Sequence, residues 1–273
     1  MWFSQKNNLS LKRRIMSRFW FLGLILGFFP LAGTPDKVWS GEVTLAVASN
    51  FTRPIKKIAT AFQEKSGHKV RLVFGSSGKI FAQISHGAPF DVFLSADQEK
   101  PHSLIQNNLA LADSRFSYAI GKLALWAPKR GHAPGPSDLI NPAVRKIALA
   151  NPKLAPYGRA AHQLLQSLKL DETLAPKLVW GENIAQTYQF IASGNADMGF
   201  VSQSQLGPDQ KGVWIIPADL HDPILQDAVL LNIAQNNSAA RDFLTFLQSD
   251  DARKIILAHG YHLTEREGLN GTD

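Results

Sequence analysis

Short apolar segments alternate with amphipathic helical segments along this chain, and each apolar segment ends in a polar turn. The apolar run 43–48 stops at Ser49-Asn50, and apolar residues then recur at helical spacing until Gly67. The run 70–74, whose apolar residues alternate, stops at Gly75-Ser76-Ser77-Gly78 before another helical segment. This alternation predicts an α/β fold in which a mostly parallel sheet is covered by helices.

The polar turns are the positions at which such a fold binds ligands. In open α/β sheets, ligands lie at the carboxyl ends of the strands. Ser49-Asn50 and the turn 75–78 stand at strand ends and also at helix starts, where backbone N–H groups have no partner within the helix. Two such ends that converge would form a pocket for an anion.

The alternation resumes after a loop rich in proline and glycine, which indicates a second lobe. The loop spans 128–136, and it is followed by a strand over 146–150 and a helix over 158–168. We expect the following limits: 1–40 signal peptide, 41–121 first part of lobe 1, 122–229 lobe 2, and 230–273 return to lobe 1.

The first 40 residues have the layout of a secretory signal. A basic stretch is followed by the apolar run 19–29, and small residues come after it. The run is too short and too interrupted to favour a permanent membrane span. An uncleaved amphipathic anchor is the alternative, and Pro30 disfavours the long helix that it would need. We therefore expect export and cleavage near Ser40.

Charge and cysteine content exclude several classes of protein. The first 40 residues hold six of the 29 Lys and Arg but one of the 22 Asp and Glu, so the remainder carries 23 bases against 21 acids. The basic balance therefore belongs largely to the signal and predicts no nucleic-acid partner. The chain has no cysteine, which excludes disulfides, thiolate metal sites and a lipidated cysteine anchor.

The Gly-Ser-Ser-Gly turn at 75–78 is the strongest local candidate for a binding site. Glycines permit close approach, and serine hydroxyls and successive amides can surround an anion. Ser76 and Ser77 are alternatively plain helix caps. The turn matches neither a P-loop nor the Gly-x-Ser-x-Gly motif of hydrolases. No histidine and acid can be placed beside Ser77 from the sequence, so a secreted serine hydrolase is the weaker alternative.

Together with its neighbours, this turn resembles a known family. The segment 46–97, which includes Gly-Ala-Pro-Phe-Asp-Val-Phe-Leu-Ser-Ala-Asp at 87–97, is similar to the molybdate-binding periplasmic proteins of ABC importers. The resemblance continues through 151–158, 181–186 and 196–202. It implies a hinged, two-lobed periplasmic binding protein of type II that grips molybdate or tungstate with hydroxyl and amide donors and without a counter-ion. It implies no enzyme activity and no cofactor.

The resemblance also implies which residues bind the oxyanion. Ser49 and Ser77 match hydroxyl ligands of the first lobe, whereas Tyr157 and Ile184 match positions that donate backbone N–H groups from the second. Asn50 is either a further amide donor or a helix cap beside Thr52. Ser76 is a doubtful member of the set. So is Ser202, which stands where some relatives have a tyrosine.

Other polar residues suggest structural roles. Asp91 and Asp97 would repel an anion, so we expect them to cap helices or hold strand ends. Lys79 either attracts anions or is a solvated residue of a first helical turn. His259 and His262 form one spaced pair without a third ligand, so no free metal cation is expected.

The expected partners follow from the resemblance. They are a membrane permease and its ATPase, with contact to the membrane only through the permease, and the protein itself is expected to be a periplasmic monomer. Sulfate and phosphate stay alternative ligands, because they share the tetrahedral shape of molybdate and tungstate.

Overall fold

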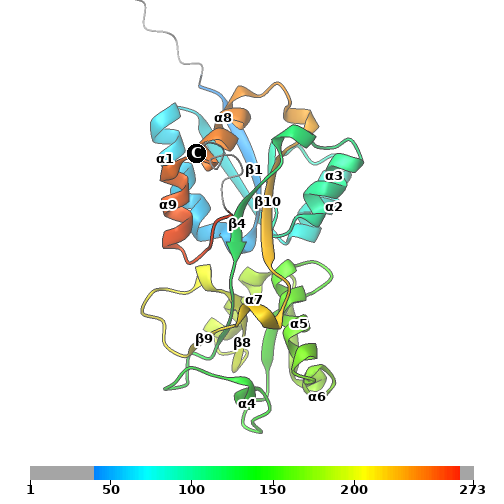
Figure 1. Cartoon of the computed structure of the whole chain (residues 1–273), viewed down its shortest axis with the longest axis vertical. Coiled ribbons are helices and arrows are strands. Elements are labelled where there is room, and N and C mark those ends of the chain that lie inside the picture. Colours follow the sequence, from blue (N-terminus) through cyan, green and yellow to red (C-terminus); the bar gives the residue numbers. More distant parts are fainter. Residues whose placement is uncertain (1–39, 265–273) are drawn as a thin grey trace, which may run out of the picture. The chain divides into compact units, whose positions relative to one another are not determined.

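The computed structural model describes residues 40–264, which form two five-stranded sheets with helices on both faces (Figure 1). The predicted signal lies outside the described residues, apart from Ser40. In the described range, no helix combines the length and the apolar character that crossing a membrane would require.

The first sheet has the strand order β2-β1-β3-β10-β4. β1 is parallel to β2 and β3, and β10 is antiparallel to both β3 and β4, so four of the five strands run in one direction. The strands are β1 (Glu42–Ala48), β2 (Lys69–Gly75), β3 (Val92–Leu94), β4 (Phe116–Gly121) and β10 (Ile224–Leu230).

Side chains of β1 alternate between two apolar layers. Val43, Leu45 and Val47 are buried against α1, α8 and α9, whereas Ala46 packs on the other face with residues of α2 and α3. Figure 1 shows these two groups of helices on opposite sides of the sheet. The helices are α1 (Thr52–Ser66), α2 (Ser77–Ser85), α3 (Glu99–Gln106), α8 (Ser238–Leu247) and α9 (Asp250–Ala258).

The second sheet repeats this plan with the order β7-β6-β8-β5-β9, in which β5 alone runs against the other strands. Ile147 and Leu149 pack with residues of α5, and Ala148 packs on the opposite face with Ile191 of α7. The strands are β5 (Leu123–Trp126), β6 (Ile147–Ala150), β7 (Leu178–Gly181), β8 (Met198–Ser202) and β9 (Val213–Ile215). The helices are α4 (Pro136–Leu139), α5 (Pro156–Ser167), α6 (Asp171–Leu174) and α7 (Ile184–Ala192).

Six short 3₁₀ helices complete the described elements. They are η1 (Ser49–Phe51), η2 (Ala112–Ser114), η3 (Ala175–Lys177), η4 (Gln203–Gln205), η5 (Ala218–Leu220) and η6 (Asn232–Ala234). η1 follows β1 directly and leads into α1, so the turn that contains Ser49 and Asn50 is itself helical.

The prediction of a two-lobed α/β protein with mostly parallel sheets is confirmed. Only Lys122 separates β4 of the first sheet from β5 of the second, and the chain returns between β9 and β10. Residues 224–229 were assigned to lobe 2 from the sequence, and this is wrong because β10 pairs with β3 and β4 of the first sheet. The apolar run predicts a buried strand but carries no information about its partners.

Candidate functional site

A cavity lies where the strand ends of the first lobe meet two helix starts of the second. It is small and its walls come from both lobes, so anything held in it contacts both. Its walls carry no charged side chain. They are formed by Ala48, Ser49, Asn50, Gly75, Ser76, Ser77, Ala96, Ala155, Pro156, Tyr157 and Ile184. Five of these residues are the predicted ligands, and Ser76 is one of the two doubtful ones.

The wall from the first lobe is built around the start of α2. Ser76 is the N-cap, and its Oγ accepts a long hydrogen bond of 3.4 Å from the Lys79 N–H. Ser77 is fully buried, and its Oγ accepts from the Ala96 N–H at 2.9 Å. Because a hydroxyl has one proton to donate and the acceptor side of Ser77 is occupied, its O–H can point into the cavity.

The wall from the second lobe consists of two helix N-termini. α5 begins at Pro156, which lacks an N–H, so Tyr157 carries the first free N–H of that helix. α7 begins at Ile184, and Oδ1 of its N-cap Asn183 accepts from the Ala185 and Gln186 N–H groups but not from the Ile184 N–H. Both N–H groups lack an intrahelical acceptor and lie at the positive ends of helix dipoles.

The side chain of Asn50 has a different role from either one expected. Its Nδ2 donates to Gln226 Oε1 at 2.9 Å and to Tyr261 Oη at 3.0 Å, which uses both protons of the amide. It caps no helix, because the N-cap of α1 is Phe51. The amide nitrogen of Asn50 therefore belongs to a buried network, although the residue also lines the cavity.

Ser202 is buried behind the cavity and does not line it. Its Oγ donates to Tyr157 Oη at 3.0 Å and lies 2.8 Å from Ser204 Oγ. Its position at the end of β8 therefore places its hydroxyl beside the Tyr157 side chain.

Sequence reasoning missed the polar network behind the cavity. Gln226 is fully buried in β10 and also bonds Tyr118 and Tyr157. Burial, the largest effect, raises the pKa of both tyrosines well above the ordinary value, so their hydroxyls stay neutral. A polar Gln-Asp pair inside the apolar run 224–230 was the available signal, whereas nothing near Tyr261 marks it.

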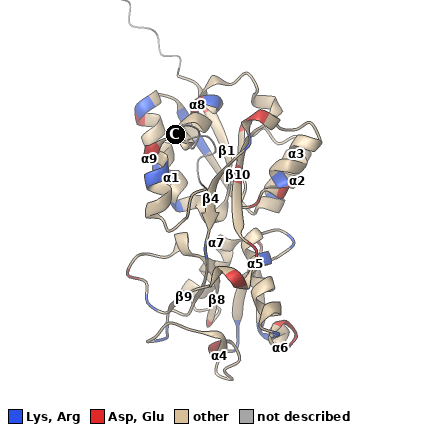
Figure 2. Ribbon diagram, viewed as in Figure 1, with Lys and Arg blue, Asp and Glu red and all other residues tan. Residues whose placement is uncertain are grey.

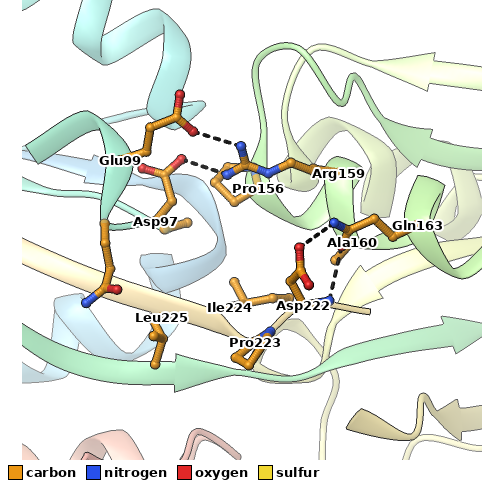
Figure 3. Close-up of a pocket in the computed structure, with 12 residues that line it drawn as sticks. Asp97, Glu99, Pro156, Arg159, Ala160, Gln163, Asp222, Pro223, Ile224 and Leu225 are labelled. Carbon is orange, nitrogen blue, oxygen red and sulfur yellow. Dashed lines mark hydrogen bonds and ion pairs between the residues drawn. The ribbon is translucent and has the colours of Figure 1, made fainter. Parts of the chain in front are cut away.

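Charged residues connect the two lobes around the cavity without lining it. Lys79 Nζ lies 2.6 Å from Glu182 Oε1, and the Lys79 side chain is 54% exposed, so Lys79 is a solvated residue that is paired with an acid of the other lobe. Arg159 of α5 reaches Asp97 at 3.4 Å and Glu99 at 2.8 Å, beside a second cavity of about 220 Å³ (Figure 3). Charges of both signs are spread over the helices of both lobes (Figure 2).

The two aspartates have structural partners, as the sequence suggests. Asp91 accepts from the Thr44 N–H at 2.6 Å and from Asn237 Nδ2 at 3.1 Å. Asp97 accepts from the Lys100 N–H at 3.2 Å near the start of α3. Within residues 40–264, no group of three or more His, Asp or Glu is arranged to hold a metal ion.

Comparisons with known proteins agree with this architecture. The family described as bacterial extracellular solute-binding protein matches residues 43–262. A molybdate-binding protein of Rhodobacter capsulatus is 45% identical over 223 residues, which cover 81% of this chain and 88% of that protein. One from Azotobacter vinelandii is 45% identical over 229 residues, which cover 82% and 91%.

A solved structure supports the same assignment. The periplasmic molybdate-binding protein of Azotobacter vinelandii matches with a TM-score of 0.79 and 37% identity, covering 82% of this chain and all of that one. The fold, the position of the cavity and the sequence identity thus all support the same family assignment. This chain belongs to the family of bacterial extracellular solute-binding proteins.

Proposed function

We propose that this protein captures molybdate in the periplasm and delivers it to the membrane permease of an ABC importer. The observation that carries the proposal is the uncharged cavity between the lobes. Ser49 and Ser77, which carry hydroxyls, line it from one lobe, and Tyr157 and Ile184, whose N–H groups have no acceptor within their helices, line it from the other. Ser49 Oγ donates to Asn183 Oδ1 at 3.4 Å, and we propose that the anion replaces this acceptor. The names of the relatives in Rhodobacter capsulatus and Azotobacter vinelandii support molybdate as the anion.

Neutral donors suit capture followed by release. A hydrogen bond to a charged group contributes roughly 1.5–3 kcal/mol, so several of them can exceed the cost of closing the lobes. Since only the closed form assembles donors from both lobes, the anion stabilises closure by its different affinity for the two forms. The same donors separate from one another when the lobes open, which allows release.

The choice among anions depends on size and protonation. Tungstate shares the shape and nearly the size of molybdate, so we propose that it binds as well. Sulfate is smaller. Phosphate carries a proton near neutral pH and therefore needs an acceptor, whereas the cavity walls offer mainly donors.

The delivery partners are proposed on the same basis. We expect a permease and its cytoplasmic ATPase to receive the anion, and the protein to act as a monomer without a cofactor. Export would follow from the signal predicted in residues 1–40.

A thermal-shift panel tests the proposal. The protein without residues 1–40 is heated with molybdate, tungstate, sulfate or phosphate. A ligand at a hundred times its dissociation constant stabilises a protein by about 2.7 kcal/mol, so molybdate and tungstate should raise the Tm clearly and sulfate and phosphate much less. A shift with sulfate or phosphate alone would reassign the ligand, and no shift with any of the four would contradict the proposal.

The hydrolase alternative is tested separately. The Ser77 hydroxyl accepts from a backbone N–H and has no bond to a histidine within the described part of the chain. We expect no hydrolysis of a generic ester, and a rate that is abolished by Ser77→Ala would revive the alternative.

A further inference from the structure

Gln226 is the centre of the polar network behind the cavity. Its Oε1 accepts from Asn50 Nδ2 at 2.9 Å and from Tyr118 Oη at 3.0 Å, and its Nε2 donates to Tyr157 Oη at 3.2 Å. The residue is fully buried, and the pairing of β10 with β4 shifts register between Gln226 and Asp227. Three of the four hydrogen bonds that the Gln226 amide can make are thus formed, all with uncharged partners.

The partners of Gln226 come from both lobes. Asn50 of η1 and Tyr118 of β4 belong to the first lobe, whereas Tyr157 lies in the first turn of α5 in the second lobe. Ser204 of η4 makes further hydrogen bonds between the lobes. Its Oγ donates to the Asn50 carbonyl at 2.7 Å and accepts from Tyr261 Oη at 3.0 Å. Buried neutral hydrogen bonds therefore join the lobes directly behind the cavity.

We propose that Gln226 is a positioning residue that holds the Asn50 and Tyr157 walls of the cavity at their binding distance in the closed protein. The proposal rests on the proposed function, because Tyr157 is one of the residues that donate an N–H to the anion. When the lobes separate, the Gln226 bond to Tyr157 breaks, while its bonds to Asn50 and Tyr118 stay within lobe 1. Only the first of these bonds can therefore favour closure.

The Tyr157 hydroxyl and the Gln226 amide pack closely against the backbone of Gly121. Gly121 ends β4, and a Cβ placed there would lie 2.1 Å from Tyr157 Oη and 2.6 Å from Gln226 Nε2. Gly121 has no positive φ, so its backbone conformation does not require glycine. The hydroxyl of Tyr157 occupies space that only the absence of a side chain at this position leaves open.

The test compares two tyrosines that share one partner. Tyr157→Phe and Tyr118→Phe each remove one fully buried hydroxyl bonded to Gln226, but only Tyr157 lies across the lobe boundary. Tyr157→Phe also removes the bond from Ser202, but that bond lies within lobe 2 and does not depend on closure. By calorimetry with molybdate, we expect Tyr157→Phe to raise the Kd roughly three- to tenfold, which corresponds to the one neutral hydrogen bond that crosses the lobes. Tyr118→Phe should lower the Tm and leave the Kd within about twofold.

A double-mutant cycle assigns the effect to Gln226. Gln226→Met keeps the length of the side chain and removes its hydrogen bonds, so it should raise the Kd by a similar factor. Combining it with Tyr157→Phe should add little to either single change, because both remove the same bond. Additive effects, an unchanged Kd for Tyr157→Phe, or equal losses for the two tyrosine variants would overturn the proposal.

Failure of the proposed function can be distinguished from failure of the role proposed for Gln226. If the wild-type protein binds none of the four oxyanions, that function fails. The network is then judged by small-angle X-ray scattering of the unliganded proteins. Tyr157→Phe should increase the radius of gyration relative to Tyr118→Phe, and identical values would overturn the role of Gln226 in closure.

Discussion

Ser77 illustrates how one contact prepares a side chain for its role. The Ala96 N–H occupies the acceptor side of its hydroxyl at 2.9 Å, so the proton is left to donate into the cavity. Ala96 follows β3 and Ser77 starts α2, so the two strand ends of the first lobe orient each other. The residue is fully buried, and water does not compete for this bond.

Ser77→Ala should weaken molybdate binding without unfolding the protein. Loss of one hydrogen bond to a charged ligand, about 1.5–3 kcal/mol, corresponds to a Kd raised roughly ten- to 150-fold. Calorimetry measures the Kd, and circular dichroism reports the fold. Ser85→Ala, in the last turn of the same helix with its Oγ on the Phe81 carbonyl, is the control and should leave the Kd unchanged. Unchanged affinity for Ser77→Ala would remove Ser77 from the site.

The residues of the site differ in how far the sequence predicts them. Ser49, Ser77, Tyr157 and Ile184 were proposed as ligands, and the structure brings all four to one cavity. A strand-end turn and a helix start can be recognised locally, which is why their convergence was expected. The amide of Asn50 could not be assigned, because its partners Gln226 and Tyr261 are 176 and 211 residues away.

At the scale of elements, the cavity is shaped by helices whose first turns lie very close to a neighbouring stretch of backbone. The Gly78 N–H near the start of α2 donates to the Leu154 carbonyl at 2.9 Å, which joins the two lobes. A Cβ at Gly78 would lie 3.0 Å from that carbonyl oxygen. Gly158 in α5 is tighter still, since its Cβ would lie 2.1 Å from the Ala150 carbonyl oxygen within the second lobe.

These two glycines give opposite predictions. Gly78→Ala should raise the Kd for molybdate severalfold with little change in Tm, because its clash exists only when the lobes are closed. Gly158→Ala should lower the Tm by several degrees, because its clash exists in every folded form. Thermal unfolding without ligand and calorimetry with it measure both effects. A drop in Tm for Gly78→Ala as large as that for Gly158→Ala would contradict this difference.

At the scale of the whole molecule, ion pairs between the lobes add to closure. Arg159 of the second lobe contacts Asp97 and Glu99 of the first, as Figure 3 shows. A side-chain hydrogen bond from Arg159, followed by the charge of Lys100, lowers the pKa of Glu99 below its ordinary value of 4.5. Because Glu99 is largely exposed, solvent limits this contribution to a few tenths of a kcal/mol.

The sign of the pH effect follows from the lowered pKa. The contribution of Glu99 is complete above the unfolded pKa and is lost as the pH falls through the lowered folded pKa. Wild type should therefore unfold at a slightly higher Tm than Glu99→Gln at pH 7, and the difference should vanish on acidification below 4.5. Raising the salt concentration at pH 7 should also reduce it. A difference that is constant with pH would show that the charge of Glu99 is not its cause.

The sequence by itself determined the alternation of strands and helices, the polar turns at the strand ends and the neutral character of the site. These features depend on local periodicity and on the chemistry of Gly, Ser and Asn in turns. Only the tertiary structure decided the sheet to which β10 belongs and the network that joins the Asn50 amide, Ser202 and Gln226 behind the cavity. The physical reason is that a polar group binds the partner that folding brings beside it, and these partners lie in distant parts of the chain.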